Sequence, residues 1–64
     1  METFELPKLS APAHRALAAH GVASLNDLVA LQESEIKKWH GLGPNGIRML
    51  KAAMAEHGLT FADA

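Results

Sequence analysis

The residues of this sequence that are best suited to binding chemistry gather around one glycine-rich segment, "WHGLGPNGIRML", which runs from Trp39 to Leu50. A helix is expected to begin at Pro44 or Asn45, directly after the first glycines. The first N–H groups of a helix have no acceptor within the helix, and together with the helix dipole they attract anions. Because Arg48 and Lys51 follow on the same expected helix, the segment has the groups needed to hold a phosphate.

The apolar residue between the glycines indicates how the turn is built. Gly41 and Gly43 are expected to take backbone angles that are closed to other residues. Leu42 is expected to enter the core between the two flanking helices and lock the turn. A turn of this kind leaves the amino end of the following helix facing solvent.

The charge of the chain is the main difficulty for a nucleic-acid interpretation. The formal net charge is −1, whereas proteins that hold duplexes by neutralising phosphates are usually strongly basic. The cations are nevertheless concentrated around the glycines, at Lys37, Lys38, Arg48 and Lys51. Two interpretations remain open: a locally basic face on a neutral domain, and an ordinary solvated helix surface.

Other reactive groups form no recognisable site in the sequence. The chain has no cysteine and four histidines: His14, His20, His40 and His57. The histidines lack the i, i+4 spacing of common zinc sites, so we expect helix-cap and surface roles and no metal. No serine lies in a catalytic frame, and Glu33 and Glu35 are typical of a helix start. We therefore expect no enzymatic activity, no cofactor and no small-molecule substrate.

Length and composition favour one small helical domain. A chain of 64 residues buries roughly 60% of its unfolded surface, which allows a marginal independent fold. Alanine and leucine dominate, and aromatic residues are few, which favours packed helices over a β-sandwich. The lack of cysteine, of a signal-peptide pattern and of an apolar run near the roughly 20 residues that span a bilayer favours a cytoplasmic protein without membrane contact.

Capping signals predict the first two of four or five helical pieces. Residues 10–21 begin with Ser10 as the N-cap and end at Gly21. Residues 24–31 open with a Ser-x-x-Asp capping box that ends at Asp27. The apolar residues at three- and four-residue spacing are expected to face the core: Ala13, Ala16, Leu17, Leu25, Leu28 and Val29.

Two further helices are predicted on either side of the glycines. Residues 33–40 are expected to bury Trp39 as a core residue, in preference to a role in base stacking. The last helix is expected to end at Gly58, and the apolar residues of these two helices face the core: Ile36, Ile47, Leu50 and Met54. In the tail, Leu59 and Phe61 are expected to fold back as a hydrophobic clasp.

From Leu9 to Phe61 the sequence resembles the carboxy-terminal domain of the bacterial RNA polymerase alpha subunit. The similarity rests on "DLV" in the second helix, "LG" in the glycine-rich segment and the closing "HGLTF". The resemblance implies an all-α, SAM-like fold of four to five helices with a helix-hairpin-helix core. Residues 1–8 would then be an extension, 9–61 the domain and 62–64 a tail. Because the chain starts at its own Met1 without an assembly domain, we do not expect it to be a polymerase subunit.

The resemblance also implies a grip on DNA, although few contact residues match. The family holds the minor groove with an arginine at the start of the first helix and an asparagine one turn later. Here Pro12 and Arg15 stand at those two positions. Asn45 and Gly46 stand where the family has a lysine and a serine, and Gly43 matches directly. The missing arginine is the side chain best suited to a narrow, negative groove, and Arg15 is expected to project from the same surface.

Two functions of different classes follow. The first is a small DNA-binding module that grips backbone phosphates weakly and without base preference. Its expected contact residues are Arg15, Gly41, Gly43, Asn45, Gly46, Arg48 and Lys51. The alternative is a protein-interaction module that keeps the fold and has lost the DNA contacts. It rests on the net charge, on Pro12 and on three apolar residues expected to be exposed: Phe4, Leu6 and Phe61.

Overall fold

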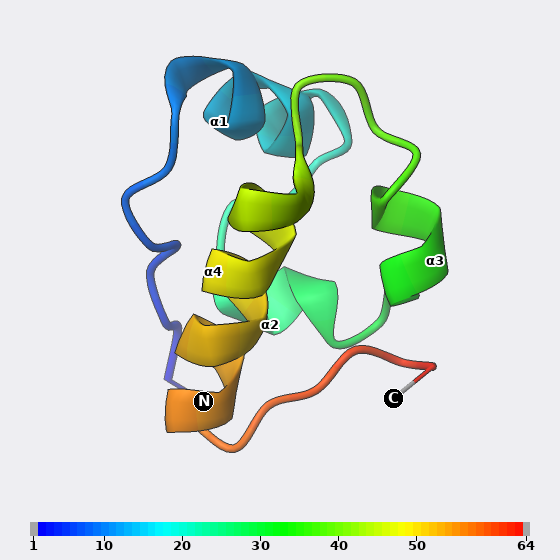
Figure 1. Ribbon diagram of the computed structural model, residues 1–64. Coiled ribbons are helices and arrows are strands. Elements are labelled where there is room, and N and C mark those ends of the chain that lie inside the picture. Colours follow the sequence, from blue (N-terminus) through cyan, green and yellow to red (C-terminus); the bar gives the residue numbers. More distant parts are fainter. Residues whose placement is uncertain (1, 64) are drawn as a thin grey trace.

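The computed structural model describes residues 2–63, which form four α-helices and no strand (Figure 1). The helices are α1 (Ala11–Ala19), α2 (Leu25–Leu28), α3 (Glu33–Ile36) and α4 (Pro44–Glu56). The longest helix, α4, crosses the middle of the molecule, with α1 and α2 behind it and α3 to one side. The predicted all-α class is confirmed for the described residues. None of their helices combines the length and the apolar character needed to cross a bilayer.

Local capping groups set the ends of the two longer helices, as predicted. The Ser10 hydroxyl accepts a hydrogen bond from the Ala13 N–H at 3.4 Å, which caps the start of α1. Gly21 and Gly58 follow the last residues of α1 and α4 with φ angles of +77° and +70°. Glycine reaches this left-handed conformation without a steric penalty, so each helix ends there.

The two middle helices are shorter than predicted. α2 ends at Leu28, and the Val29 side chain is 39% exposed, so the prediction that it points inward was wrong. α3 ends at Ile36, and from Lys38 on the N–H groups of Lys38 and Trp39 bond to carbonyls three residues back. This tighter turn changes the direction of the side chains that follow it. Trp39 is half-buried and packs against the core, so its predicted burial is confirmed only in part.

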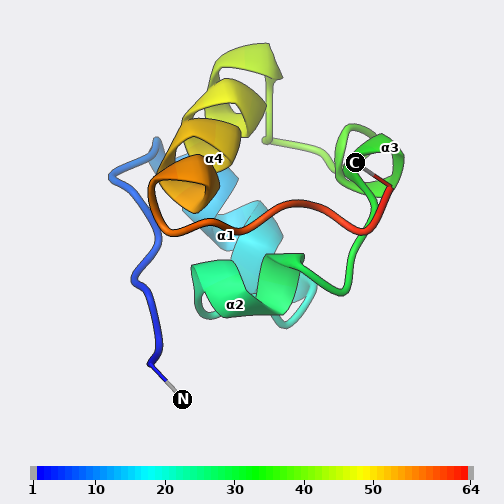
Figure 2. The ribbon, with the colours of Figure 1, turned by 90° about the horizontal axis from the view of Figure 1, so that it is seen from below.

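The core lies between α4 and the other three helices. It is formed by twelve buried apolar side chains: Ala13, Ala16, Leu17, Val22, Leu25, Leu28, Ile36, Leu42, Ile47, Leu50, Met54 and Phe61. Each helix contributes, and Leu42 adds a residue from the connection between α3 and α4, as predicted. Phe61 is only 4% exposed, so the predicted clasp forms. Figure 2 looks onto the tail as it crosses this end of the molecule from α4 towards α3.

The residues before α1 form an arm that packs on α2. The Leu25 N–H donates to the Phe4 carbonyl at 2.9 Å, and the Phe4 N–H donates to Asn26 Oδ1 at 2.8 Å. Phe4 and Leu6 are half-buried against the core. Together with the buried Phe61, this corrects the expectation that these three apolar residues are exposed. The protein-interaction alternative thus loses its three exposed apolar side chains and keeps the net charge and Pro12 as its support.

Two histidines, each at the end of a helix, stack on aromatic rings from other segments. His20, the C-cap of α1, lies parallel to Trp39 with ring centroids 3.8 Å apart and an interplanar angle of 1°. His57, the C-cap of α4, stacks on Phe4 at 3.9 Å and 15°. The repeated His-Gly helix ending therefore joins each of these helices to a distant part of the chain.

Candidate nucleic-acid interface

The connection between α3 and α4 is held by Leu42 and depends on Gly41. Leu42 is buried, and Gly41 has a φ of +91°. A Cβ atom at position 41 would lie 2.7 Å from the carbonyl oxygen of Pro12 and 3.4 Å from its Cβ. Only glycine allows this approach, so the predicted role of Gly41 is confirmed. The same contact brings position 12, where the resembling family has its arginine, next to the turn.

Gly43 has a different role from the one predicted. Its φ of −84° and ψ of −178° are extended backbone angles that other residues adopt, and a Cβ there would meet no atom within 4 Å. The prediction that Gly43 needs a restricted conformation was wrong. Gly43 is the N-cap of α4, and it has no side chain to accept a hydrogen bond from the first turn. The amino end of α4 is consequently left without a side-chain cap.

Gly46 serves packing in the first turn of α4. A Cβ atom at this position would lie 2.9 Å from Cδ1 of Leu42. The absence of that atom allows Leu42 to sit against the helix and fill the core under the turn. The Ile47 N–H already donates to the Gly43 carbonyl at 3.1 Å. This leaves the amides of Asn45 and Gly46, which precede the first intrahelical donor, as those that can bind an anion.

A hollow of about 380 Å³ opens at this end of α4, and we call it the amide hollow. It is lined by Lys8, Leu9, Ser10, Ala13, Gly41, Gly43, Pro44, Asn45, Gly46 and Met49. The structure thus brings four of the predicted contact residues together. It adds Lys8, a cation that the sequence did not single out. The only sequence signal for Lys8 is its place just before α1, and its proximity to the glycines depends on the packing of Pro12 on Gly41.

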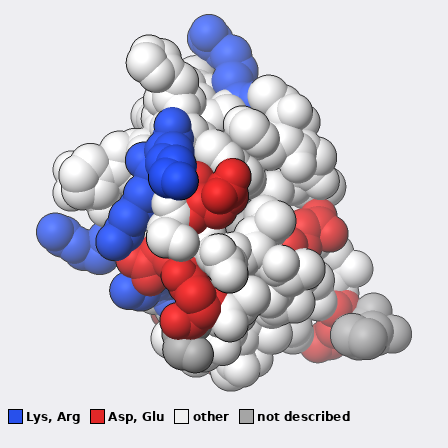
Figure 3. All heavy atoms as spheres, turned by 90° about the vertical axis from the view of Figure 1, so that its right-hand side faces the viewer, with Lys and Arg blue, Asp and Glu red and all other residues white. Residues whose placement is uncertain are grey.

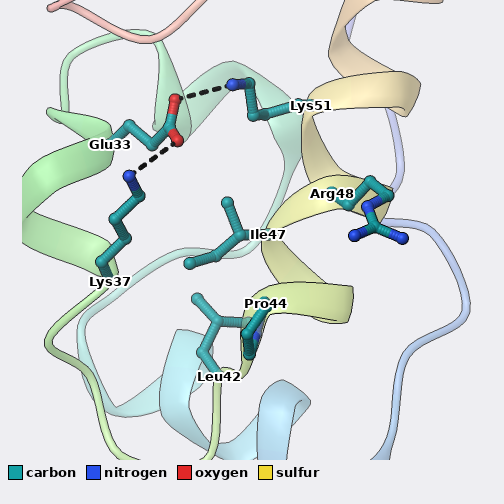
Figure 4. A pocket seen from close by; sticks show the side chains of 7 residues that line it. All are labelled: Glu33, Lys37, Leu42, Pro44, Ile47, Arg48 and Lys51. Atoms are coloured by element: carbon teal, nitrogen blue, oxygen red, sulfur yellow. Dashed lines mark ion pairs between the residues drawn. The ribbon is translucent and has the colours of Figure 1, made fainter.

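Arg48 and Lys51 lie elsewhere, in a hollow of about 510 Å³ between α3 and α4 that we call the lysine groove (Figure 4). Its lining residues are Glu33, Lys37, Leu42, Pro44, Ile47, Arg48 and Lys51. Lys51 Nζ is 3.0 Å from Glu33 Oε1, and Lys37 Nζ is 3.4 Å from Glu33 Oε2. The hydrogen bond from Lys51 is the main reason that the pKa of Glu33 is lowered. Lys51 is therefore already paired with a carboxylate.

Arg48 and Arg15 are not engaged in this way. Both side chains are exposed, and neither takes part in an ion pair among the described residues. Arg48 lines the lysine groove, and its guanidinium points away from the Glu33 ion pairs (Figure 4). It lies about one helical turn beyond Asn45 on α4. Arg15 is on α1 and lines neither hollow. The structure therefore does not gather all seven predicted contact residues at one place.

The surface charge is mixed. On the face that Figure 3 shows, lysine and arginine side chains adjoin aspartate and glutamate side chains, and no continuous basic field covers the face. This agrees with the formal net charge of −1. Within residues 2–63, no group of three or more histidine, aspartate and glutamate side chains has an arrangement that could hold a metal ion.

Sequence comparison gives no relative from which to transfer a function. No model of a known protein family matches the chain, and no curated protein matches its sequence.

Proposed function

We propose that this chain is a small nucleic-acid-binding module that holds backbone phosphates at the amino end of α4. The observation that carries the proposal is the amino end of α4, which has no side-chain cap and opens into a hollow that also contains Lys8. Free backbone amides, the positive end of a helix dipole and an ammonium group are all complementary to a phosphate. Such contacts fix the position of a nucleic acid without reading its bases.

The turn before α4 supports a helix-hairpin-helix within a SAM-like domain. Two helices are joined by Gly-Leu-Gly, with the leucine in the core and Gly41 in a left-handed conformation. This is the arrangement that the resemblance to the polymerase alpha-subunit domain implies. In the proposed module, Lys8 supplies the cation next to the amides of Asn45 and Gly46, and Arg48 acts from the neighbouring lysine groove. Lys51 and Arg15 contribute only through their longer-range fields.

The proposed binding is weak, and its affinity falls only gradually as salt is added. Few cations face the amide hollow and the net charge is −1, so only a few counterions are released when a duplex binds. The test is a titration of the isotope-labelled protein with a short DNA duplex, followed by amide chemical shifts at low and moderate salt. We expect shifts at Lys8, Gly43, Asn45 and Gly46 that fade as salt is added.

A substitution at the N-cap makes this test specific. In Gly43→Asp, the carboxylate accepts from the free amides of α4 and occupies the phosphate position, so duplex binding should be lost. The fold should be kept, with a gain of a few tenths of a kcal/mol from the new cap, because nothing obstructs a Cβ there. Ala30→Asp adds the same charge at an exposed position outside the hollow and should bind almost as the wild type does. Equal binding by both variants, or wild-type shifts located elsewhere, would contradict the proposal.

A further inference from the structure

The lysine groove has the shape and composition of a binding site of its own. Its floor is formed by Leu42, Pro44 and Ile47, and Ile47 is the least buried of the large apolar core residues. Its volume of about 510 Å³ falls within the roughly 300–1,000 Å³ of typical ligand sites. A second hollow of about 300 Å³ continues along α4 towards Phe61, and it shares Glu33 and Lys51 with the first. The lysine groove and this second hollow lie next to each other along one side of α4.

The rim of this groove carries more positive than negative charge. Lys37, Arg48 and Lys51 line it, and Glu33 is the one carboxylate among its lining residues. The Glu33 side chain is 20% exposed, whereas the Lys37 and Lys51 side chains are 60% and 54% exposed. The Glu33 carboxylate therefore lies between the two lysines. The apolar parts of the lysine side chains form the walls of the groove, and their ammonium groups remain close to solvent. The groove thus holds a carboxylate, supplied by the chain itself, above an aliphatic floor.

We propose that this groove docks an acidic, aliphatic peptide segment of a protein partner. The aliphatic side chains of the segment would cover Leu42 and Ile47, and its carboxylates would bind Lys37 and Lys51 in competition with Glu33. α4 has 13 residues and is about 20 Å long, which is enough to support several residues of an extended peptide. A nucleic acid fits the groove less well, because the floor is formed by the apolar residues Leu42, Pro44 and Ile47.

This docking site is independent of the proposed nucleic-acid function. The amide hollow and the lysine groove have only Pro44 in common. A peptide in the groove and a duplex at the amides can therefore be followed separately through the amide shifts of different residues.

The experiment uses the whole labelled protein and a short, end-blocked peptide of alternating leucine and aspartate. The matched control peptide alternates leucine and lysine. The acidic peptide should shift the amides of Leu42, Ile47 and Lys51, and the basic peptide should not. Glu33→Gln removes the internal competitor and should tighten binding about two- to fivefold, the range expected for one exposed ion pair. Lys37→Gln and Lys51→Gln should each weaken binding by a similar factor.

Lys38→Gln is the control for lost charge, because Lys38 does not line the groove, and binding should stay within error of the wild type. Glu33→Gln keeps the backbone N–H that donates to Asp63 Oδ1 at the start of α3, and thermal unfolding checks that the variant folds. The docking proposal is overturned if the two peptides bind equally, or if Glu33→Gln weakens binding. It is also overturned if the duplex shifts the groove residues and the acidic peptide does not.

Discussion

Three glycines in the described part of the chain have a positive φ, and they differ in what surrounds them. Gly21 and Gly58 would meet no atom within 4 Å if they carried a Cβ. Gly41 would meet the backbone of Pro12 at 2.7 Å, which is closer than the atoms can approach. The first two positions therefore need glycine for conformation alone. Gly41 needs it for conformation and for the contact between α1 and the turn.

Replacing these glycines separates the two requirements. Gly21→Ala should lower the free energy of unfolding by about 1–2 kcal/mol, the cost of a left-handed alanine. Gly41→Ala should lower it by a further 1 kcal/mol or more, roughly the cost of overpacking, because the carbonyl of Pro12 has to move. Urea unfolding of both variants measures the difference. Equal losses would show that the contact with Pro12 contributes nothing to stability.

At the scale of the elements, the start of α3 is capped by the carboxy-terminal tail. The Glu33 N–H donates to Asp63 Oδ1 at 2.8 Å, and the Ser34 N–H donates to Asp63 Oδ2 at 3.4 Å. The hydrogen bond from Glu33 is the main cause of the lowered pKa of Asp63. The lysines lower the pKa of the Glu33 carboxylate as well. A helix of four residues is thus held at its start by the tail and on its surface by α4.

These lowered pKa values make the domain less stable in acid. A carboxylate whose pKa is lower in the folded than in the unfolded state stabilises the fold above the unfolded pKa. That contribution is lost as the pH falls through the folded pKa. The free energy of unfolding should therefore fall as the pH drops below about 4, and Asp63→Asn should make this fall shallower. Urea unfolding across the acid range measures it.

Glu56→Gln serves as the matched control for this pH series. Glu56 is an exposed carboxylate near the end of α4, and its side chain makes no hydrogen bond or ion pair among residues 2–63. If Glu56→Gln made the acid loss of unfolding free energy as shallow as Asp63→Asn does, the cap on α3 would not be the source of the pH dependence.

The elements that local chemistry sets could be predicted from the sequence, and those set by distant contacts could not. Ser10, Gly21 and Gly58 act on residues within one turn, and their roles follow from spacing alone. The cap from Asp63 reaches across 30 positions, and no short pattern indicates it. The predicted length of α3 was too great. After Ile36, a tighter turn satisfies the backbone N–H groups and leads into the glycine-rich segment.

At the scale of the whole molecule, Leu42 ties the turn to the core. It lies against the first turn of α4, where Gly46 makes room for it, and it is 4% exposed. It also forms part of the floor of the lysine groove. A chain of 64 residues has only a few kcal/mol of net stability. The loss of one such side chain is therefore a large fraction of the total.

Leu42→Ala should lower the free energy of unfolding by about 2–4 kcal/mol, because a cavity remains under the turn. Met49→Ala removes a comparable apolar side chain from the next turn of α4, but Met49 is 42% exposed, so its loss should stay within about 0.5 kcal/mol. Thermal and urea unfolding compare the two. A small effect at Leu42 would mean that the turn closes without it.

The candidate site could be predicted only in part. The glycines and the free amides of α4 were identifiable, since they lie in one continuous segment. The place of Lys8 in the same hollow was not, because it depends on how α1 packs against Gly41. The pairing of Lys51 with Glu33 was not predicted, and it joins residues from two helices. Contacts between side chains that tertiary packing brings together cannot be predicted from the spacing of residues in the sequence.

The stack of His20 on Trp39 gives the molecule a built-in optical reporter. Trp39 is the one tryptophan of the chain, and its indole lies flat against an imidazole at 3.8 Å. The emission of an indole depends on the groups that touch it, so fluorescence should change when the end of α1 separates from the segment that precedes Gly41. The opening of this corner can then be timed by stopped-flow mixing without attaching a dye, and compared with the rate at which the helices melt.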